Sequence, residues 1–168
     1  MGRYRPPAPK SSPYITRDGY ERIDNELTAL WKRRAEVTKA VTAAAAEGDR
    51  SENAEYIYRK KELRGIDRRI RYLQKRLPEL TIVDETPSDP SRVFFGAWVQ
   101  LEDEDGGQHT YRIVGSDEID MDKRYVSMDA PLAKALFKKQ SDDEVEIQTP
   151  KGAHCYVILA IHYGDLSA

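Results

Sequence analysis

The chain has 168 residues, of which 39% are hydrophobic and 33% are charged, and its mean hydropathy is −0.73. This composition is too polar for a membrane protein and too rich in Leu, Ile, Val and Tyr for a disordered one, so we expect one ordinary domain or two small ones. No apolar run reaches the roughly 18 residues of a spanning helix, and the N-terminus lacks the apolar segment of a secretory signal. We therefore expect a cytoplasmic protein with no membrane partner, and the single cysteine, Cys155, agrees with a reducing compartment.

The two halves of the chain differ in the sign of their charge. Residues 1–80 contain 19 Lys and Arg against 12 Asp and Glu, whereas residues 81–168 contain 8 against 17. The net charges of the halves are therefore +7 and −9, within a total of −2. The positive first half is suited to a nucleic acid, whereas the second half is not.

The first 13 residues are rich in proline and in basic side chains, with Pro6, Pro7, Pro9 and Pro13 among them. Such a segment cannot build a core, so residues 1–13 predict an extended, flexible basic arm. We expect this arm to be a tail without a fixed contact.

Residues 14–80 have the apolar spacing of an antiparallel coiled-coil hairpin. Apolar positions recur every three or four residues in two series, each interrupted once, by Arg34 and by Arg59. The series are Tyr20, Ile23, Leu27, Leu30, Val37, Val41 and Ala44, followed by Tyr56, Leu63, Ile66, Ile70, Leu73 and Leu77. If the helices fold back on each other, facing positions have sequence numbers that add to 96 or 97, which places the turn at Gly48 and Asp49. We expect the first helix to extend from Arg17 to about Glu47, and Pro78 to end or kink the second.

After the hairpin we expect a linker over residues 81–91 and a small folded domain over residues 92–168. Short runs rich in β-branched and aromatic residues predict five strands. These strands are Val93–Leu101, Thr110–Gly115, Arg124–Met128, Glu144–Gln148 and Tyr156–Tyr163, and one helix is expected from Pro131 to Lys139. The pattern indicates a small antiparallel α+β domain.

The expected turn of the hairpin is polar, with the sequence G-D-R-S-E-N-A-E-Y over residues 48–56. Asp49 with Glu52 three residues later fits a capping box for the second helix, and local physics alone favours this interpretation. The pairing register also places Glu52 opposite Ala44, where the two carboxylates can project from the free end of the hairpin. Since Mg²⁺ takes six oxygen ligands, Asp49 and Glu52 would supply only part of a magnesium site, and another macromolecule would supply the rest.

The expected second helix is strongly basic and has only Glu62 and Asp67 as internal acids. Its basic residues are Arg59, Lys60, Lys61, Arg64, Arg68, Arg69, Arg71, Lys75 and Arg76. Such a surplus of one sign costs stability through self-repulsion, so it indicates a polyanion nearby, although any single residue can belong to a merely solvated face. The sequence contains no Gly-rich phosphate loop and no His or Cys at metal-ligand spacing, so no self-contained active site is visible.

Many ordered segments of the chain resemble the bacterial Gre transcript cleavage factors, the GreB type more closely than the GreA type. The resemblance covers nearly the whole chain from Tyr14 onward. Besides the polar turn, the matching segments are I-T-R-D-G-Y-E-R at 15–22, R-G-I-D-R-R-I-R-Y-L at 64–73, V-F-F-G-A-W-V at 93–99, R-I-V-G at 112–115, A-P-L-A-K-A-L at 130–136 and T-P-K-G at 149–152. Agreement at so many places in order is far more specific than a coiled coil alone.

The resemblance implies a coiled-coil hairpin followed by an FKBP-like domain that docks at the rim of the secondary channel of bacterial RNA polymerase. It implies that Asp49 and Glu52 help to hold the second catalytic Mg²⁺ of the polymerase and orient the attacking water. The polymerase then cuts backtracked RNA itself, and this chain is an activator and no nuclease alone. The nascent RNA 3′ segment is the second partner implied, and the candidates for its contacts nearest the turn are Arg50, Arg59, Lys60 and Arg64.

The segment that the resemblance assigns to polymerase docking is Asp129, Ala130 and Pro131, where the family usually has Asp-Ser-Pro. Asp142 stands where the family usually has Gly, and Pro78 is unexpected at the base of the hairpin. The polar turn itself is intact, which argues against the inhibitory Gre relatives. We expect the protein to be a monomer and to hold no magnesium stably by itself.

Three other functions are open on the sequence. A Gre-fold regulator would bind the polymerase channel without promoting cleavage. A prolyl isomerase would need an aromatic-lined cleft, for which Trp98, Tyr111, Phe137 and Tyr156 are available, although strand alternation buries most of them as core. An RNA-binding coiled-coil arm would bind RNA tightly through residues 1–80 alone.

Overall fold

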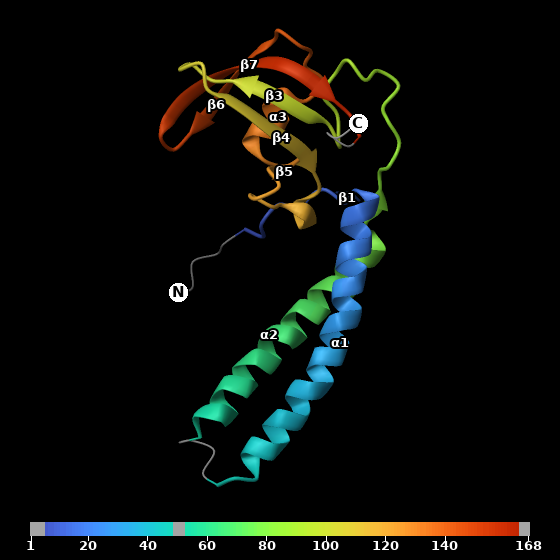
Figure 1. The fold of residues 1–168 in the computed structure, drawn as a ribbon, viewed down its shortest axis with the longest axis vertical. Helices are drawn as coiled ribbons and strands as arrows, with labels where there is room; N and C mark the ends of the chain where they lie inside the picture. The colour runs from blue at the N-terminus through green and yellow to red at the C-terminus, as the bar shows by residue number, and fades with distance from the viewer. Residues whose placement is uncertain (1–5, 49–52, 165–168) are drawn as a thin grey trace. The chain divides into compact units, whose positions relative to one another are not determined.

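The computed structural model describes residues 6–48 and 53–164 (Figure 1). The chain divides into two compact units: Asp18–Leu80 form one, and the segment up to Arg17 joins the residues from Thr81 onward in the other. No helix in the described part of the chain is long and apolar enough to cross a membrane.

The first unit is a hairpin of two long helices, α1 (Arg17–Ala45) and α2 (Ala54–Arg76), which lie side by side in Figure 1. The residues at the centre of their interface are Val37, Ile66 and Ile70, flanked by Leu27, Leu30, Val41 and Leu63. All seven belong to the two apolar series, which confirms the predicted hairpin. The first helix ends two residues earlier than expected. Pro78 lies in a short 3₁₀ helix, η1 (Leu77–Glu79), directly after the end of α2, as its lack of a backbone N–H requires.

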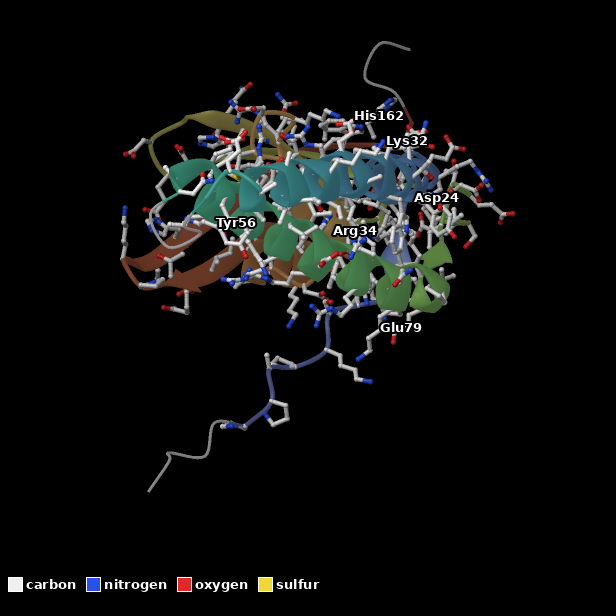
Figure 2. The ribbon with its side chains drawn as sticks, turned by 90° about the horizontal axis from the view of Figure 1, so that it is seen from below. Asp24, Lys32, Arg34, Tyr56, Glu79 and His162 are labelled. Carbon is white, nitrogen blue, oxygen red and sulfur yellow. The ribbon has the colours of Figure 1, made fainter. Side chains whose placement is uncertain are left out.

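The two arginines that interrupt the apolar series are neutralised by carboxylates. The Nε of Arg34, labelled in Figure 2, lies 2.7 Å from a carboxylate oxygen of Asp67 on the other helix. Arg59 bonds Glu55 and Glu62 on its own helix at 2.8 and 2.9 Å. A charged side chain can therefore occupy a seam position because its partner is within reach.

The cap of α2 differs from the predicted capping box. Asn53 is the N-cap residue, and its side-chain oxygen accepts a hydrogen bond of 3.1 Å from the N–H of Tyr56. Its amide nitrogen donates to the carbonyl oxygen of Ala44 at 2.8 Å, which links the ends of the two helices. The capping box of Asp49 and Glu52 is therefore wrong, because an asparagine carries both the acceptor for the cap and a donor for α1, whereas a carboxylate accepts only.

The second unit contains a five-stranded sheet with the strand order β5-β4-β3-β7-β6. The strands are β3 (Trp98–Glu102), β4 (Gln108–Val114), β5 (Tyr125–Ser127), β6 (Glu144–Thr149) and β7 (Gly152–His162). The helix α3 (Pro131–Leu136) lies against the sheet beside β6 (Figure 1). Their shared core consists of Val93, Ala97, Val99, Leu101, Ile113, Ala133, Leu136, Val145 and Ile158. The α+β class is confirmed.

Several details of this unit differ from the expectation. The strand predicted over Val93–Leu101 begins only at Trp98, and the strand predicted over Tyr156–Tyr163 already begins at Gly152 and ends at His162. The pair β4–β5 is parallel, whereas a wholly antiparallel sheet was expected. The chain between these strands passes through the 3₁₀ helix η2 (Ser116–Glu118) instead of a tight hairpin, so β5 runs in the same direction as β4. The helix α3 is also three residues shorter than predicted, because Phe137 leaves the helical conformation at ψ 129° and Lys138 has a φ of 67°.

A second, two-stranded sheet joins distant parts of the second unit. The strands β1 (Tyr14–Ile15) and β2 (Thr81–Ile82) pair in parallel, and the N–H of Thr81 donates to the carbonyl oxygen of Pro13 at 2.7 Å. The structure thus draws the boundary elsewhere than expected: residues 14–17 belong with the second unit, and the expected linker 81–91 begins with a strand. Two-residue strands are too short to show a period of two, so the sequence carries no signal for them.

A buried carboxylate ties the chain before α1 to this unit. Glu118 is 2% exposed and accepts hydrogen bonds from the N–H and the hydroxyl of Thr16 and, at 2.8 Å, from the N–H of Gly115. Gly115 permits this approach, since a Cβ there would lie 2.1 Å from the carbonyl oxygen of Tyr14. The expectation of an untethered arm is therefore wrong at its end, where Pro13 and the residues after it are fixed by main-chain bonds.

Replacing Glu118 with Ala is expected to lower the free energy of unfolding by about 3 kcal/mol, because three buried donors lose their common acceptor. Glu118→Gln keeps one acceptor oxygen and should lose less. Thermal or urea unfolding of the full chain measures the difference. The control is Glu85→Ala, at an exposed carboxylate, which we expect to change stability by less than about 0.5 kcal/mol. Equal losses in Glu118→Ala and Glu85→Ala would contradict the role of the buried carboxylate.

Candidate functional site

The predicted catalytic residues fall, in the sequence, between the last residue of α1 and the first residue of α2. Asp49 and Glu52, and the RNA candidate Arg50, are outside the described residues. The flanking structure is defined: α1 ends at Ala45, Gly48 has a φ of 132°, and Asn53 bonds Ala44 at 2.8 Å. Tyr56, labelled in Figure 2, is in the first turn of α2. In the described part of the chain, no group of three or more His, Cys, Asp and Glu side chains is placed to hold a metal ion.

The described RNA candidates on α2 differ in how their charge is used. Arg59 donates hydrogen bonds to the carboxylates of Glu55 and Glu62. These bonds raise the pKa of its guanidinium, and the bond to Glu55 has the larger effect. The Nζ of Lys60 lies 5.9 Å from the centroid of the Tyr56 ring. Arg64, by contrast, is exposed to solvent. Of these three residues, Arg64 is therefore the best placed to meet a phosphate.

Arg64 is part of a longer row of exposed basic residues, which we call the basic stripe. Its members are Lys61, Arg64, Arg68, Arg71 and Lys75. Their spacing of three and four residues places them on one face of α2 over about 21 Å. Among the described residues, no carboxylate forms an ion pair with any of them, whereas the acids Glu62 and Asp67 pair with Arg33 and Arg34 of α1. Of these five, only Arg64 was predicted from the sequence as an RNA contact, because that prediction considered the basic residues nearest the turn. The spacing of the other four is readable in the sequence as well.

Glu62 is the centre of an ion-pair network between the helices. It accepts hydrogen bonds from the Nε and Nη2 of Arg33 at 3.0 and 2.7 Å and from Arg59 at 2.9 Å. These bonds lower the pKa of the Glu62 carboxyl, and the bond from Arg33 has the largest effect. The hydrogen bond to Glu62 in turn raises the pKa of the Arg33 guanidinium. The network links the two helices of the hairpin, whose register is set by the apolar interface.

The lowered pKa of Glu62 gives a pH dependence with a definite sign. Its contribution to stability is present above the unfolded value, about 4.3, and is lost as the pH falls through the lower folded pKa. We expect Glu62→Gln to lower the Tm by about 1–2 °C at pH 7, since the pair is exposed and screened. The gap between the two proteins should close as the pH falls below the lowered folded pKa of Glu62. Glu21→Gln, at an exposed position, is the control, and a gap that widens in acid would contradict the assignment.

The predicted docking segment lies between β5 and α3. Asp129 follows β5, Ala130 is the N-cap of α3 and Pro131 its first residue. The N–H of Asp129 donates to the Ser127 hydroxyl at 3.0 Å. The Asp129 carboxylate accepts from both the N–H and the hydroxyl of Ser12, at 2.8 and 2.5 Å. The structure therefore brings a residue of the N-terminal arm, for which no role was predicted, to this segment.

An apolar hollow of about 270 Å³ adjoins the docking segment. It is lined by Ser12, Phe95, Ile113, Met128, Asp129, Ala133, Lys134 and Phe137. Phe137 is 44% exposed and packs edge-on against Phe94 with 5.6 Å between ring centroids. An exposed aromatic ring beside a charged residue is typical of protein-binding surfaces.

Most of the aromatic residues considered for a prolyl isomerase are engaged in packing within the sheet. Only Phe137 borders the hollow. Tyr111 and Tyr156 pack against the core of the sheet, as strand alternation predicts. Trp98 packs against Tyr125 with 5.8 Å between centroids, and the Arg112 guanidinium lies 5.8 Å from the Trp98 ring. The structure therefore gives no support to that alternative.

The chain is thus a two-domain protein. Its first domain is a hairpin of two long helices with an exposed basic face, and its second is an α+β domain. The chain belongs to the GreA/GreB family. Residues 13–82 match the family's N-terminal domain, described as transcription elongation factor, N-terminal, and residues 87–163 match the domain described as transcription elongation factor, GreA/GreB, C-term. These two matches account for nearly all of the described chain.

Relatives named transcription elongation factor GreB align with the whole chain. One from Xanthomonas axonopodis pv. citri is 54% identical over 168 residues, covering 99% of this chain and 100% of the relative. One from Pseudomonas aeruginosa is 56% identical over 164 residues, covering 97% and 98%. Among solved structures, the GreA factor homolog 1 protein of Thermus thermophilus is 27% identical, covers 89% of this chain and 97% of its own, and has a TM-score of 0.41. The family assignment rests on the sequence matches, which are of the GreB type.

Proposed function

We propose that this chain is a transcription elongation factor that enters the secondary channel of bacterial RNA polymerase and stimulates the polymerase's own Mg²⁺-dependent cleavage of backtracked RNA. It would thereby rescue arrested complexes in the cytoplasm. It acts as a monomer and has no nuclease activity of its own. The observation that supports this most is the identity of 54–56% with proteins named GreB across 97–99% of the chain.

In this proposal the polar turn supplies acidic groups to an active site that belongs to the polymerase. Asp49 and Glu52 would contribute carboxylate oxygens to a shared Mg²⁺ whose other ligands come from the polymerase and the RNA. When bound, the ion lowers the pKa of its water and offsets negative charge at the phosphate. The donor set fits this use, since two hard carboxylates leave most of an octahedral shell to other molecules. The two carboxylates also orient the water by accepting its hydrogen bonds.

The basic stripe would run beside the extruded RNA 3′ segment. Its charges form no ion pairs with the acids of the described chain, so phosphates can neutralise them without breaking an existing pair. Arg59 and Lys60 would contribute less, because Arg59 already bonds two carboxylates and Lys60 lies over a ring. Among the described candidates, Arg64 is thus the one we retain.

The second unit would dock on the rim of the channel through Asp129, Ala130 and Pro131. The hollow beside Asp129 offers exposed apolar area for the same contact, with Lys134 and Asp129 as polar groups at its edge. A polar rim around an apolar centre is the usual anatomy of a specific interface.

The test is to add the purified full-length protein and Mg²⁺ to a stalled, backtracked polymerase complex and to follow the RNA. We expect short 3′ fragments only when protein, polymerase and Mg²⁺ are all present, and no cleavage of free RNA by the protein alone. Binding to the polymerase without shortening of the transcript would contradict the proposal and favour the Gre-fold regulator.

A further inference from the structure

We infer that Ser12 positions Asp129, so that the N-terminal arm helps to set the strength of polymerase docking. This inference rests on the proposed function, because it assigns to Asp129 a contact with the polymerase. Ser12 itself is a positioning residue, which acts through the carboxylate that it holds.

The contact between Ser12 and Asp129 fixes the carboxylate in two ways. The main-chain N–H of Ser12 donates to Oδ2 at 2.8 Å, and its hydroxyl donates to Oδ1 at 2.5 Å. Hydrogen bonds to a charged acceptor are short and about twice as strong as neutral ones. Because each oxygen has its own donor from one residue, both the position and the rotation of the carboxylate are set.

Ser12 can do this because the chain after it is anchored. Pro13 restricts Ser12 to an extended conformation, and the carbonyl oxygen of Pro13 accepts from the N–H of Thr81 at 2.7 Å. The next two residues form β1, in which Ile15 is fully buried. The residues from Pro6 to Ser11 are all exposed, so Ser12 marks the point at which the arm meets the second unit.

The clasp prepares Asp129 for a partner without blocking it. A carboxylate offers about four acceptor positions, and the two bonds from Ser12 take only two of them, so these bonds by themselves do not exclude a donor from the polymerase. A side chain that is ordered before binding loses less conformational freedom on binding. Ser12 and Asp129 also both line the apolar hollow, so release of the clasp would change one wall of that surface.

Ser127 completes the arrangement from inside the second unit. Its hydroxyl accepts from the N–H of Asp129 at 3.0 Å, and its carbonyl oxygen accepts from the N–H of Ala130 at 3.0 Å. The backbone of the docking segment is therefore held by Ser127, whereas the charged end of Asp129 is held by Ser12. This division predicts that loss of the Ser12 hydroxyl disturbs the side chain and leaves the segment folded.

The experiment compares Ser12→Ala, Ser12→Thr and Ser11→Ala in the full chain. We expect Ser12→Ala to weaken binding to the core polymerase about fivefold, and to leave the cleavage rate at saturating factor unchanged, because docking and chemistry use different units. Ser12→Thr keeps the hydroxyl and should restore the affinity. Ser11→Ala, at the exposed neighbouring serine, should bind like the unchanged protein.

A double-mutant comparison with Asp129→Asn isolates the path through the carboxylate. Asp129→Asn alone should weaken binding, and Ser12→Ala should add nothing in that background. The inference is overturned if Ser12→Ala binds as well as or better than the unchanged protein, if it lowers the saturated cleavage rate, or if its effect persists beside Asp129→Asn. Weakened binding in Asp129→Asn with none in Ser12→Ala refutes only the role of Ser12, whereas normal binding of Asp129→Asn refutes the docking role as well. A protein that binds but never shortens the transcript refutes the proposed function instead.

Discussion

Replacing Asp49 with Ala is expected to slow stimulated RNA cleavage by about 100-fold or more while leaving polymerase affinity nearly unchanged. The carboxylate acts on charge and water at the reacting phosphate, so its loss removes an interaction that matters in the transition state. In the proposed function, docking belongs to the second unit and the RNA contacts belong to the basic stripe. Neither should therefore respond to this change.

The measurement is the single-turnover cleavage rate of a backtracked complex at saturating factor, with affinity measured separately by competition. The matched control is Glu47→Ala, which removes a nearby exposed carboxylate that is not one of the pair. Glu52→Ala should slow cleavage as Asp49→Ala does. Should Asp49→Ala cut at the rate of the unchanged protein, or Glu47→Ala lose as much as Asp49→Ala, the role proposed for the turn would be wrong.

The second large effect is expected from the basic stripe. Changing Arg64 and Arg68 together to Gln should raise the factor concentration needed for half-maximal cleavage about tenfold in complexes with a long extruded RNA. Each lost phosphate contact with a single strand should also lower the slope of log affinity against log salt by about 0.7. The saturated cleavage rate should change little, because the acidic turn is untouched.

The control for the stripe is a double variant with the same change of charge, Arg33→Gln with Arg34→Gln. These two arginines pair with Glu62 and Asp67, so their loss should reduce hairpin stability without changing the salt slope. Equal salt slopes in the two double variants would show that net charge, and not the stripe, determines RNA engagement. Measurement in complexes with a long and a short extruded RNA separates this effect from docking.

The hydroxyl that the docking segment lacks at Ala130 has a counterpart elsewhere. The resemblance to the Gre factors implies Ser at this position of the proposed docking segment. In the structure two other hydroxyls reach Asp129, that of Ser127 at its N–H and that of Ser12 at its carboxylate. The contribution of Ala130 is therefore best judged together with Ser12.

The helical hairpin could be predicted from the sequence, because the information lies in consecutive residues. Apolar spacing of three and four residues defined both helices and their register, and the buried positions Val37, Ile66 and Ile70 confirm it. The strands of the larger sheet and α3 were also readable, since β-branched runs and Pro131 are local signals. The spacing of the basic stripe could also be read from the sequence. Only the structure shows that Glu62 and Asp67 pair with arginines of α1 and not with the stripe.

Only the tertiary structure decided which distant groups meet. Glu118 bonds Thr16 across 102 positions of the chain, and Ser12 bonds Asp129 across 117. Tertiary contacts also decided two parallel strand pairs, β1–β2 and β4–β5. They decided the cap of α2 as well, since Asn53 bonds both its own helix and Ala44 at the end of α1. Periodicity reports the face that a segment turns to the core, whereas a hydrogen bond between remote polar groups depends on where the folded backbone brings them. The sequence by itself therefore determined the two-unit design and its family, and the fold alone determined how the arm, the docking segment and the helix cap are held.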